Sequence, residues 1–192
     1  MGKVNKTALL SGALIGIGVA ANSFISEKYV GAMLFSLALL AIIKCGAQLY
    51  TGQIGYAFTK RFSFFEYISM LFLNLAGVVI AITVILYSSG GTANINILKE
   101  IATTKFSYSA IELMAKGAMC GMLIFIAVYC KSTVITIFCI MTFILCGYEH
   151  CIAMFPFLIV NVSWMNIIKF LSVVVGNSLG SIITYYALNG EA

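Results

Sequence analysis

The chain has 192 residues, of which 62% are hydrophobic and only 9% are charged, and it contains no aspartate. A soluble domain of this length needs a far more charged surface, so the composition indicates an integral membrane protein. The net charge of +5 is scattered along the chain, which argues against a nucleic-acid-binding protein. The six cysteines lie in apolar runs without metal-site spacing, and we expect neither a metal nor a cofactor.

Six apolar segments follow when the sequence is divided at its charged and polar joints. They are 7–26, 29–58, 67–88, 107–130, 132–160 and 167–188. The first resembles a signal peptide because lysines precede it, but its roughly 20 uncharged residues are enough to span a bilayer. We therefore expect an all-α integral membrane protein with six transmembrane helices, forming a single transmembrane domain over residues 1–192.

The second and fifth segments are longer than one span requires, and each contains a polar interruption with a glycine near its middle. The interruptions are 44–53 (Lys-Cys-Gly-Ala-Gln-Leu-Tyr-Thr-Gly-Gln) and 146–150 (Cys-Gly-Tyr-Glu-His). Irregular backbone at membrane depth persists only where protein or a cavity satisfies its polar groups. Broken helices in corresponding places of two halves are typical of a transporter with a central site.

Glycine pairs four residues apart occur in an order that also divides the chain into halves. The pairs are Gly12 with Gly16, Gly117 with Gly121 and Gly176 with Gly180, while in segment 67–88 only Gly77 remains of the same pattern. Small residues at this spacing let helix backbones approach closely in lipid. The order predicts two three-helix repeats, about 7–88 and 107–188. They are oppositely oriented because three crossings invert the second copy.

The single histidine, His150, lies next to Glu149 in a stretch that is otherwise uncharged from 132 to 168. An ionisable pair at membrane depth is costly, so it must face the protein interior or a water-filled path. His150 could instead be a core histidine bonded to the loop at Thr51, and Glu149 could only orient the broken backbone. Lys44, at the other break, could pair with Glu149, snorkel at a protomer boundary or add positive charge near a pore.

Four motifs resemble those of the formate/nitrite transporter family. Gly46-Ala-Gln-Leu-Tyr-Thr-Gly52 resembles its Glu/Asp-Leu-Phe-Thr-Gly loop, and Gly147-Tyr-Glu-His-Cys-Ile-Ala-Met154 resembles Gly-Phe-Glu-His-Ser-Ile-Ala-Asn-Met. Lys116-Gly-Ala-Met-Cys120 resembles Arg-Gly-Ile-Leu-Cys, and Val175-Gly-Asn-Ser-Leu-Gly180 resembles Leu-Gly-Asn-Ile-x-Gly. The matches fall in the family's order and cover nearly the whole chain.

The resemblance implies an aquaporin-like inverted repeat of three plus three helices, with helices two and five broken. It also implies a homopentamer in the cell membrane with one pore per subunit and cytoplasmic termini. The expected permeants are small monovalent anions of the formate, nitrite or hydrosulfide class, together with a proton. The resemblance also implies two constrictions, an outer one at Phe35 and Phe143 and an inner one at Leu39, Leu49 and Tyr50. The other implied site residues are a threonine in a mobile loop (Thr51), a central histidine (His150), a lysine in the vestibule (Lys105) and an asparagine that lines the pore (Asn177).

These residues suggest a mechanism in which the permeant changes its charge along the path. A bare anion faces a steep desolvation cost in an apolar slit, whereas a neutral weak acid does not. We expect Lys105 to concentrate the anion outside the first slit. Between the slits His150 would offer a hydrogen bond or a proton, so that the permeant crosses as, or nearly as, the neutral acid.

Several positions depart from the family pattern and leave substrate and gating open. Gln48 replaces an acidic residue, Gln53 stands where Asn or a small polar residue is common, Gly121 replaces an Asn, and Lys44 replaces an apolar residue. One residue is also missing between the alanine and methionine that follow the histidine motif. Gln53 and Gly121 suggest a pore that is not lined like those of the commonest members.

Two other classes of function are weighed against anion transport. A channel for small neutral solutes of the aquaporin type is disfavoured because the chain lacks Asn-Pro-Ala motifs and Pro156 is its only proline. A membrane enzyme could combine His150 with Glu149, Cys146 or Cys151. The chain has no second histidine for a metal site and no separate set of nucleophile, base and orienting group, so we expect no enzymatic activity.

Overall fold

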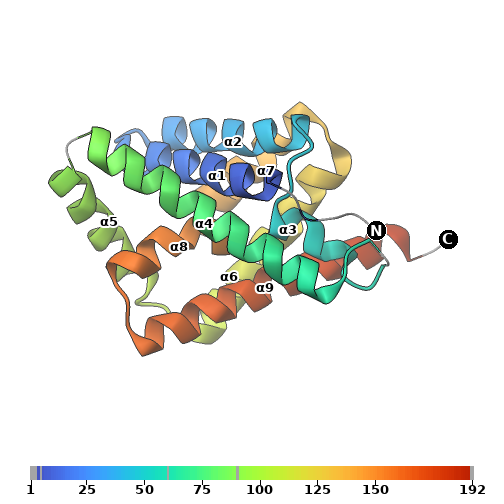
Figure 1. Cartoon of the computed structure of the whole chain (residues 1–192). Coiled ribbons are helices and arrows are strands. Elements are labelled where there is room, and N and C mark those ends of the chain that lie inside the picture. The colour runs from blue at the N-terminus through green and yellow to red at the C-terminus, as the bar shows by residue number, and fades with distance from the viewer. Residues whose placement is uncertain (1–3, 5, 60, 90, 191–192) are drawn as a thin grey trace.

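The computed structural model describes residues 4, 6–59, 61–89 and 91–190, and every regular element in these residues is helical (Figure 1). The elements are α1 (Thr7–Phe24), α2 (Lys28–Lys44), α3 (Tyr50–Gln53), the 3-10 helix η1 (Ile54–Tyr56), α4 (Phe64–Ser88), α5 (Gly91–Lys105), α6 (Ala110–Cys130), α7 (Thr133–Leu145), α8 (Cys151–Val160) and α9 (Trp164–Asn189).

The helices follow the six predicted segments. Among the described residues, α1, α4, α6 and α9 are each long and apolar enough to cross a membrane. The two remaining segments are each divided, one into α2 and α3 and the other into α7 and α8. This arrangement confirms an all-α fold with both predicted interruptions, and it is consistent with six spans.

Both interruptions begin with the same turn. Gly46 and Gly147 have φ angles of 62° and 68°, a left-handed conformation that glycine adopts without the strain of a side chain. In each turn an N–H donates to the carbonyl five residues earlier, which satisfies a free carbonyl at the helix end. The donor–acceptor pairs are Ala47 with Ile42 and Tyr148 with Phe143, each at 2.9 Å.

Asn74 of α4 satisfies the backbone groups that the first break leaves free. Its Oδ1 accepts from the N–H of Tyr50 at 2.8 Å, and its Nδ2 donates to the carbonyls of Ala8 and Gln48 at 2.7 and 3.0 Å. The amide is fully buried. It therefore fixes the first turn of α3 to both α1 and α4.

Asn177 of α9 does the same at the second break. Its Oδ1 accepts from the N–H of Cys151, and its Nδ2 donates to the carbonyls of Gly117 and Glu149, all at 2.8 Å. Both amide hydrogens are thus used, and the side chain is fully buried. The broken backbone needs these donors and holds the amide inside the protein, whereas the pore-lining role of Asn177 stays a prediction.

Glycines lie where α1 meets α4 and where α6 meets α9. A Cβ on Gly12 would lie 1.9 Å from the carbonyl oxygen of Asn74, and one on Gly121 would lie 2.1 Å from that of Asn177. The close backbone approach predicted from the glycine spacing is therefore confirmed. Gly121 packs against α9, so its departure from the family's Asn changes helix packing.

Gly121→Ala should destabilise the protein because the added methyl has only backbone to displace. Overpacking of this kind typically costs about 1–3 kcal/mol. Gly91→Ala is the matched control, since its Cβ would meet only the Leu86 carbonyl oxygen, at 3.2 Å. Thermal unfolding in mild detergent should show a clear loss for the first variant and little change for the second. Equal melting temperatures would contradict the packing assignment.

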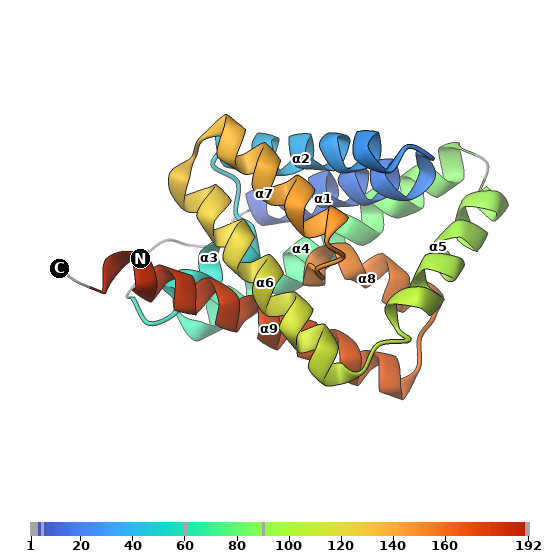
Figure 2. The same cartoon turned by 180° about the vertical axis from the view of Figure 1, so that it is seen from behind.

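Helices α2 and α7 lie side by side and run in opposite directions (Figure 2). Lys28 Nζ at the start of α2 donates to the carbonyl of Leu145 at the end of α7, at 3.5 Å. Helix α5 was not predicted as an element. It buries Leu98 and Ala102 and lies at the end of the molecule opposite to where α9 ends (Figures 1 and 2).

Candidate functional site

The two breaks bring His150 and Thr51 together inside the protein. His150 is the N-cap residue of α8, and Thr51 lies in the first turn of α3. The distance from Thr51 Oγ1 to His150 Nε2 is 2.8 Å. Both side chains are buried, with exposed fractions of 0% and 2%. The expected proximity of the histidine and the loop threonine is thus present.

The hydrogen bonds around His150 indicate its tautomer. Its Nδ1 accepts from the N–H of Ala153 at 3.3 Å, the usual contact of an N-cap side chain. In a neutral imidazole one nitrogen accepts and the other carries the hydrogen. Nε2 therefore carries the hydrogen and donates to Thr51 Oγ1. The Thr51 hydroxyl keeps its own hydrogen, which it can donate to a third group.

A cavity of about 90 Å³ reaches His150 from the side of α5. Phe35 and Phe143 line it, and their rings meet edge to face with centroids 5.8 Å apart. The ring of Phe143 lies 6.1 Å from that of His150. The two residues expected at the outer constriction therefore lie together, and Phe143 lies next to the histidine. We call this space the outer cavity.

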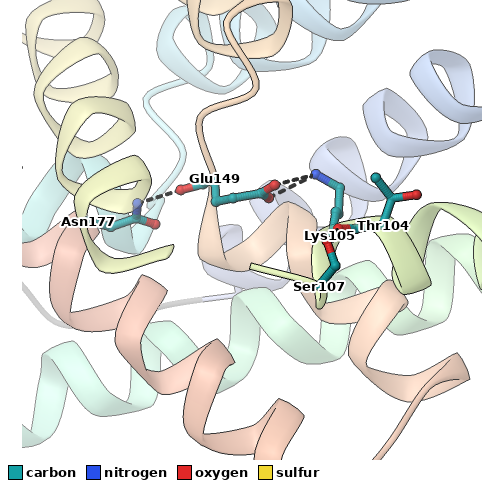
Figure 3. A network of polar contacts seen from close by, with 5 residues as sticks. All are labelled: Thr104, Lys105, Ser107, Glu149 and Asn177. Atoms are coloured by element: carbon teal, nitrogen blue, oxygen red, sulfur yellow. Dashed lines mark hydrogen bonds and ion pairs between the residues drawn. The ribbon is translucent and has the colours of Figure 1, made fainter. Parts of the chain in front are cut away.

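Lys105 and Glu149 form an ion pair at the outer cavity (Figure 3). Lys105 Nζ donates to both carboxylate oxygens of Glu149, at 2.8 and 2.9 Å. The lysine side chain is 26% exposed and the glutamate side chain is 5% exposed. The expected vestibule lysine is thus present at the cavity, but Glu149 balances its charge.

The expected pairing of Lys44 with Glu149 is wrong. Lys44 is exposed at the end of α2, whereas Glu149 follows the end of α7. Because α2 and α7 are antiparallel, these two ends lie on opposite sides of the molecule. Gln48 is the residue that matches Glu149 at the first break, since its carbonyl accepts from Asn74 as that of Glu149 accepts from Asn177.

A second cavity, of about 230 Å³, lies at the opposite end of α2, and we call it the inner cavity. Leu49 and Gln53 line it together with Arg61 and Lys131, and none of its lining residues is acidic. Oε1 of Gln53 is buried and has no hydrogen-bond partner among the described residues. Leu39 of the expected inner constriction is fully buried on α2.

Tyr50, the third residue of the expected inner constriction, ties α3 to α9. Its hydroxyl lies 2.9 Å from Ser178 Oγ, and Ser178 Oγ donates to the carbonyl of Val174 at 2.7 Å. A serine hydroxyl has one hydrogen, so Tyr50 is the donor in the first bond. Ser181 Oγ adds a second tie to α9 by donating to the carbonyl of Thr51 at 2.9 Å.

Tyr50→Phe should speed anion flux if α3 moves to open the inner constriction. The lost hydrogen bond is worth about 0.5–1.5 kcal/mol, which corresponds to a gain of roughly two- to tenfold in the open population. Stopped-flow uptake into proteoliposomes measures the gain. Ser178→Ala should give the same gain, and the double variant should add nothing. Unchanged flux in both single variants would show that this bond does not limit opening.

Sequence reasoning missed Asn74 and the partner of Glu149. The signal for Asn74 was its place in Leu73-Asn-Leu-Ala-Gly77, which matches that of Asn177 in Gly176-Asn-Ser-Leu-Gly180. The pairing of Lys105 had no signal, because it depends on where α5 folds against α8.

Comparison with known proteins identifies relatives along the whole chain. Residues 1–189 match the model of the formate/nitrite transporter family. The formate-nitrite transporter of Plasmodium malariae is 27% identical over 224 residues, covering 95% of this chain and 71% of that protein. The nitrite transporter NirC of Escherichia coli (strain K12) is 26% identical over 174 residues, covering 77% of this chain and 64% of that protein.

Two solved structures share the fold. An FNT family ion channel superposes with a TM-score of 0.80 at 20% identity, covering 96% of this chain and 87% of that chain. A pentameric formate channel with formate bound superposes with a TM-score of 0.74 at 20% identity, covering 97% and 96%. The predicted aquaporin-like fold class is thereby confirmed.

Proposed function

The chain belongs to the formate/nitrite transporter family, and from this premise we propose that it conducts small monovalent anions of the formate, nitrite or hydrosulfide class. It is a multi-pass membrane protein of a transport family and not an enzyme. The observation that carries the proposal is the single buried histidine, hydrogen-bonded to Thr51 between an outer and an inner cavity. A central donor between two openings suits permeation better than turnover of a bound substrate.

His150 acts as the central donor in this proposal. Its Nε2–H donates to Thr51 Oγ1, so the hydrogen of the Thr51 hydroxyl is the one that remains for the permeant. An anion that accepts this hydrogen bond is stabilised without water, and one that enters together with a proton from the aqueous side crosses the apolar parts as the neutral acid. The Thr51 hydroxyl can pass the hydrogen bond from the histidine to the permeant.

The constrictions lie on either side of this donor. Phe35 and Phe143 form the outer slit, where their rings meet edge to face. Leu39, Leu49 and Tyr50 form the inner slit, with Leu49 facing the inner cavity. Apolar slits of this kind select permeants by size and polarity.

The Lys105–Glu149 pair, whose lysine is partly exposed at the outer cavity, is the polar entrance of the pathway. An incoming anion can accept from the ammonium while Glu149 keeps the lysine in place. The inner cavity is the more positive of the two, since Arg61 and Lys131 line it without an acidic neighbour. The inner opening thus favours anions over cations.

Residues 7–88 and 107–188 are two copies of one three-span unit in a single transmembrane domain. This proposal is supported by contacts that occur once in each half, such as those of Asn74 and Asn177 and those of Gly12 and Gly121. The protein assembles as a homopentamer in the inner, cytoplasmic membrane, with both termini in the cytoplasm. A formate channel of the same fold is pentameric.

Uptake into proteoliposomes tests the proposed function. Formate, nitrite and hydrosulfide are offered separately at one acidic and one neutral pH, and empty liposomes measure leakage of the neutral acids. We expect protein-dependent uptake of at least one anion, faster at the acidic pH. Water or glycerol flux without uptake of any anion would favour the neutral-solute channel and reject the proposal.

A further inference from the structure

Helices α2 and α7 each present three buried side chains along the proposed pathway. The residues are Phe35, Leu39 and Ile42 on α2 and Thr136, Ile140 and Phe143 on α7, each at most 3% exposed. Spacings of three and four residues place each set on one face of its helix. Phe35 and Phe143 line the outer cavity and Ile42 lines the inner one. The seam between the two helices therefore runs from one cavity to the other.

The repeated breaks place Thr136 within this seam. Aligning Gly46 with Gly147 brings Ile42 into register with Phe143. The same alignment puts Phe35 in register with Thr136. Phe35 touches Phe143 across the outer end of the seam. Under this alignment Thr136 takes the place of Phe35 and Ile42 takes the place of Phe143. Because the two helices are antiparallel, the corresponding contact, between Thr136 and Ile42, lies at the inner end.

The hydroxyl of Thr136 is unusual among the buried serine and threonine hydroxyls of the described residues. The residue is fully buried, and Oγ1 has no hydrogen-bond partner among the described residues. The buried Ser11, Ser36 and Thr184 instead donate to carbonyls of their own helices, at 3.1, 2.6 and 2.7 Å. A buried hydroxyl without a partner is unfavourable unless something else bonds to it.

We propose that Thr136 is a second polar contact for the permeant, at the inner end of the pathway. This assignment of Thr136 rests on the proposed function, the transport of small anions. Its hydroxyl donates to an oxygen of a carboxylate or nitrite ion, or accepts from the hydroxyl of the neutral acid, after the permeant has left His150. Sulfur is a weak acceptor, so hydrosulfide gains little from this contact. Thr136 thus favours oxygen-bearing anions over hydrosulfide.

Thr136→Val tests this role because valine keeps the branched shape and removes only the hydroxyl. Formate and nitrite uptake should fall about tenfold, the loss expected for one hydrogen bond to a charged group. Hydrosulfide uptake should change by less than about twofold. Thr136→Ser should keep formate uptake. Thr184→Val is the control, since it removes a buried hydroxyl that bonds within α9, and its transport should match that of the wild type.

Melting temperature separates a transport contact from a structural one. Removing an unpartnered hydroxyl should leave the melting temperature of Thr136→Val unchanged or raise it. Wild-type formate uptake in this variant, or an equal loss for formate and hydrosulfide, would overturn the inference. A lower melting temperature would do the same. A wild-type protein that carries none of the anions would instead reject the proposed function itself.

Discussion

His150→Phe should reduce anion uptake to the level of empty liposomes while leaving the assembled protein intact. Phenylalanine fills a similar space, but it removes the Nε2–H that bonds to Thr51 and the titratable imidazole. Without that donor, the permeant must cross as a bare ion between apolar slits, which is strongly unfavourable. Stopped-flow uptake of formate into proteoliposomes is the measurement, and native mass spectrometry checks the assembly.

His150→Asn separates the hydrogen bond from the proton. Asparagine can still donate and accept, but it does not titrate. We expect slow residual uptake with little dependence on pH. Wild-type rates in His150→Phe would remove the central donor from the mechanism. A wild-type pH dependence in His150→Asn would show that the proton comes from another group.

The second large effect is on the stability of the protein when the Lys105–Glu149 ion pair is broken. Lys105→Met should strongly lower the stability, because it leaves the carboxylate of Glu149 buried and uncompensated. Losses of this kind are on the order of 3–5 kcal/mol. Glu149→Gln should cost less, because the lysine side chain is partly exposed and can turn toward water. The melting temperature in mild detergent reports both changes.

The double variant and Lys44 provide the controls. Lys105→Met combined with Glu149→Gln should recover part of the loss, because no buried charge remains. Lys44→Met should be nearly neutral, since Lys44 is exposed and lies on the opposite side from Glu149. Strictly additive losses in the double variant, or a large loss for Lys44→Met, would contradict the assigned pairing.

The sequence was sufficient for the features that depend on local chemistry. The two breaks could be predicted because glycine and polar residues interrupt apolar runs that are too long for one span. The importance of His150 and Glu149 followed from the cost of ionisable groups at membrane depth. The close approach at Gly12 and Gly121 followed from glycine spacing.

Features that depend on how distant segments meet could not be predicted in this way. Helix α5 is polar along much of its length, so hydropathy marked it only as a joint between spans. Its last residue, Lys105, reaches Glu149 only once α5 packs against α8. The expected pairing of Lys44 with Glu149 was wrong. Both residues lie at breaks in the sequence, but α2 and α7 are antiparallel, so the two breaks begin on opposite sides of the molecule.

The roles of the two asparagines also needed the fold. The resemblance to the family implied that Asn177 lines the pore. The structure uses its amide for three backbone groups. Asn74 makes the corresponding hydrogen bonds at the first break. It could have been found by aligning the two halves residue by residue.

In the proposed mechanism the permeant crosses between the slits as the neutral acid, together with a proton. Formate entry and interior pH, recorded together in proteoliposomes under an imposed membrane potential and corrected for empty liposomes, test it most directly. We expect one proton to enter with each formate, at a rate that does not respond to the potential. Formate entry without interior acidification, at a rate set by the potential, would contradict this mechanism.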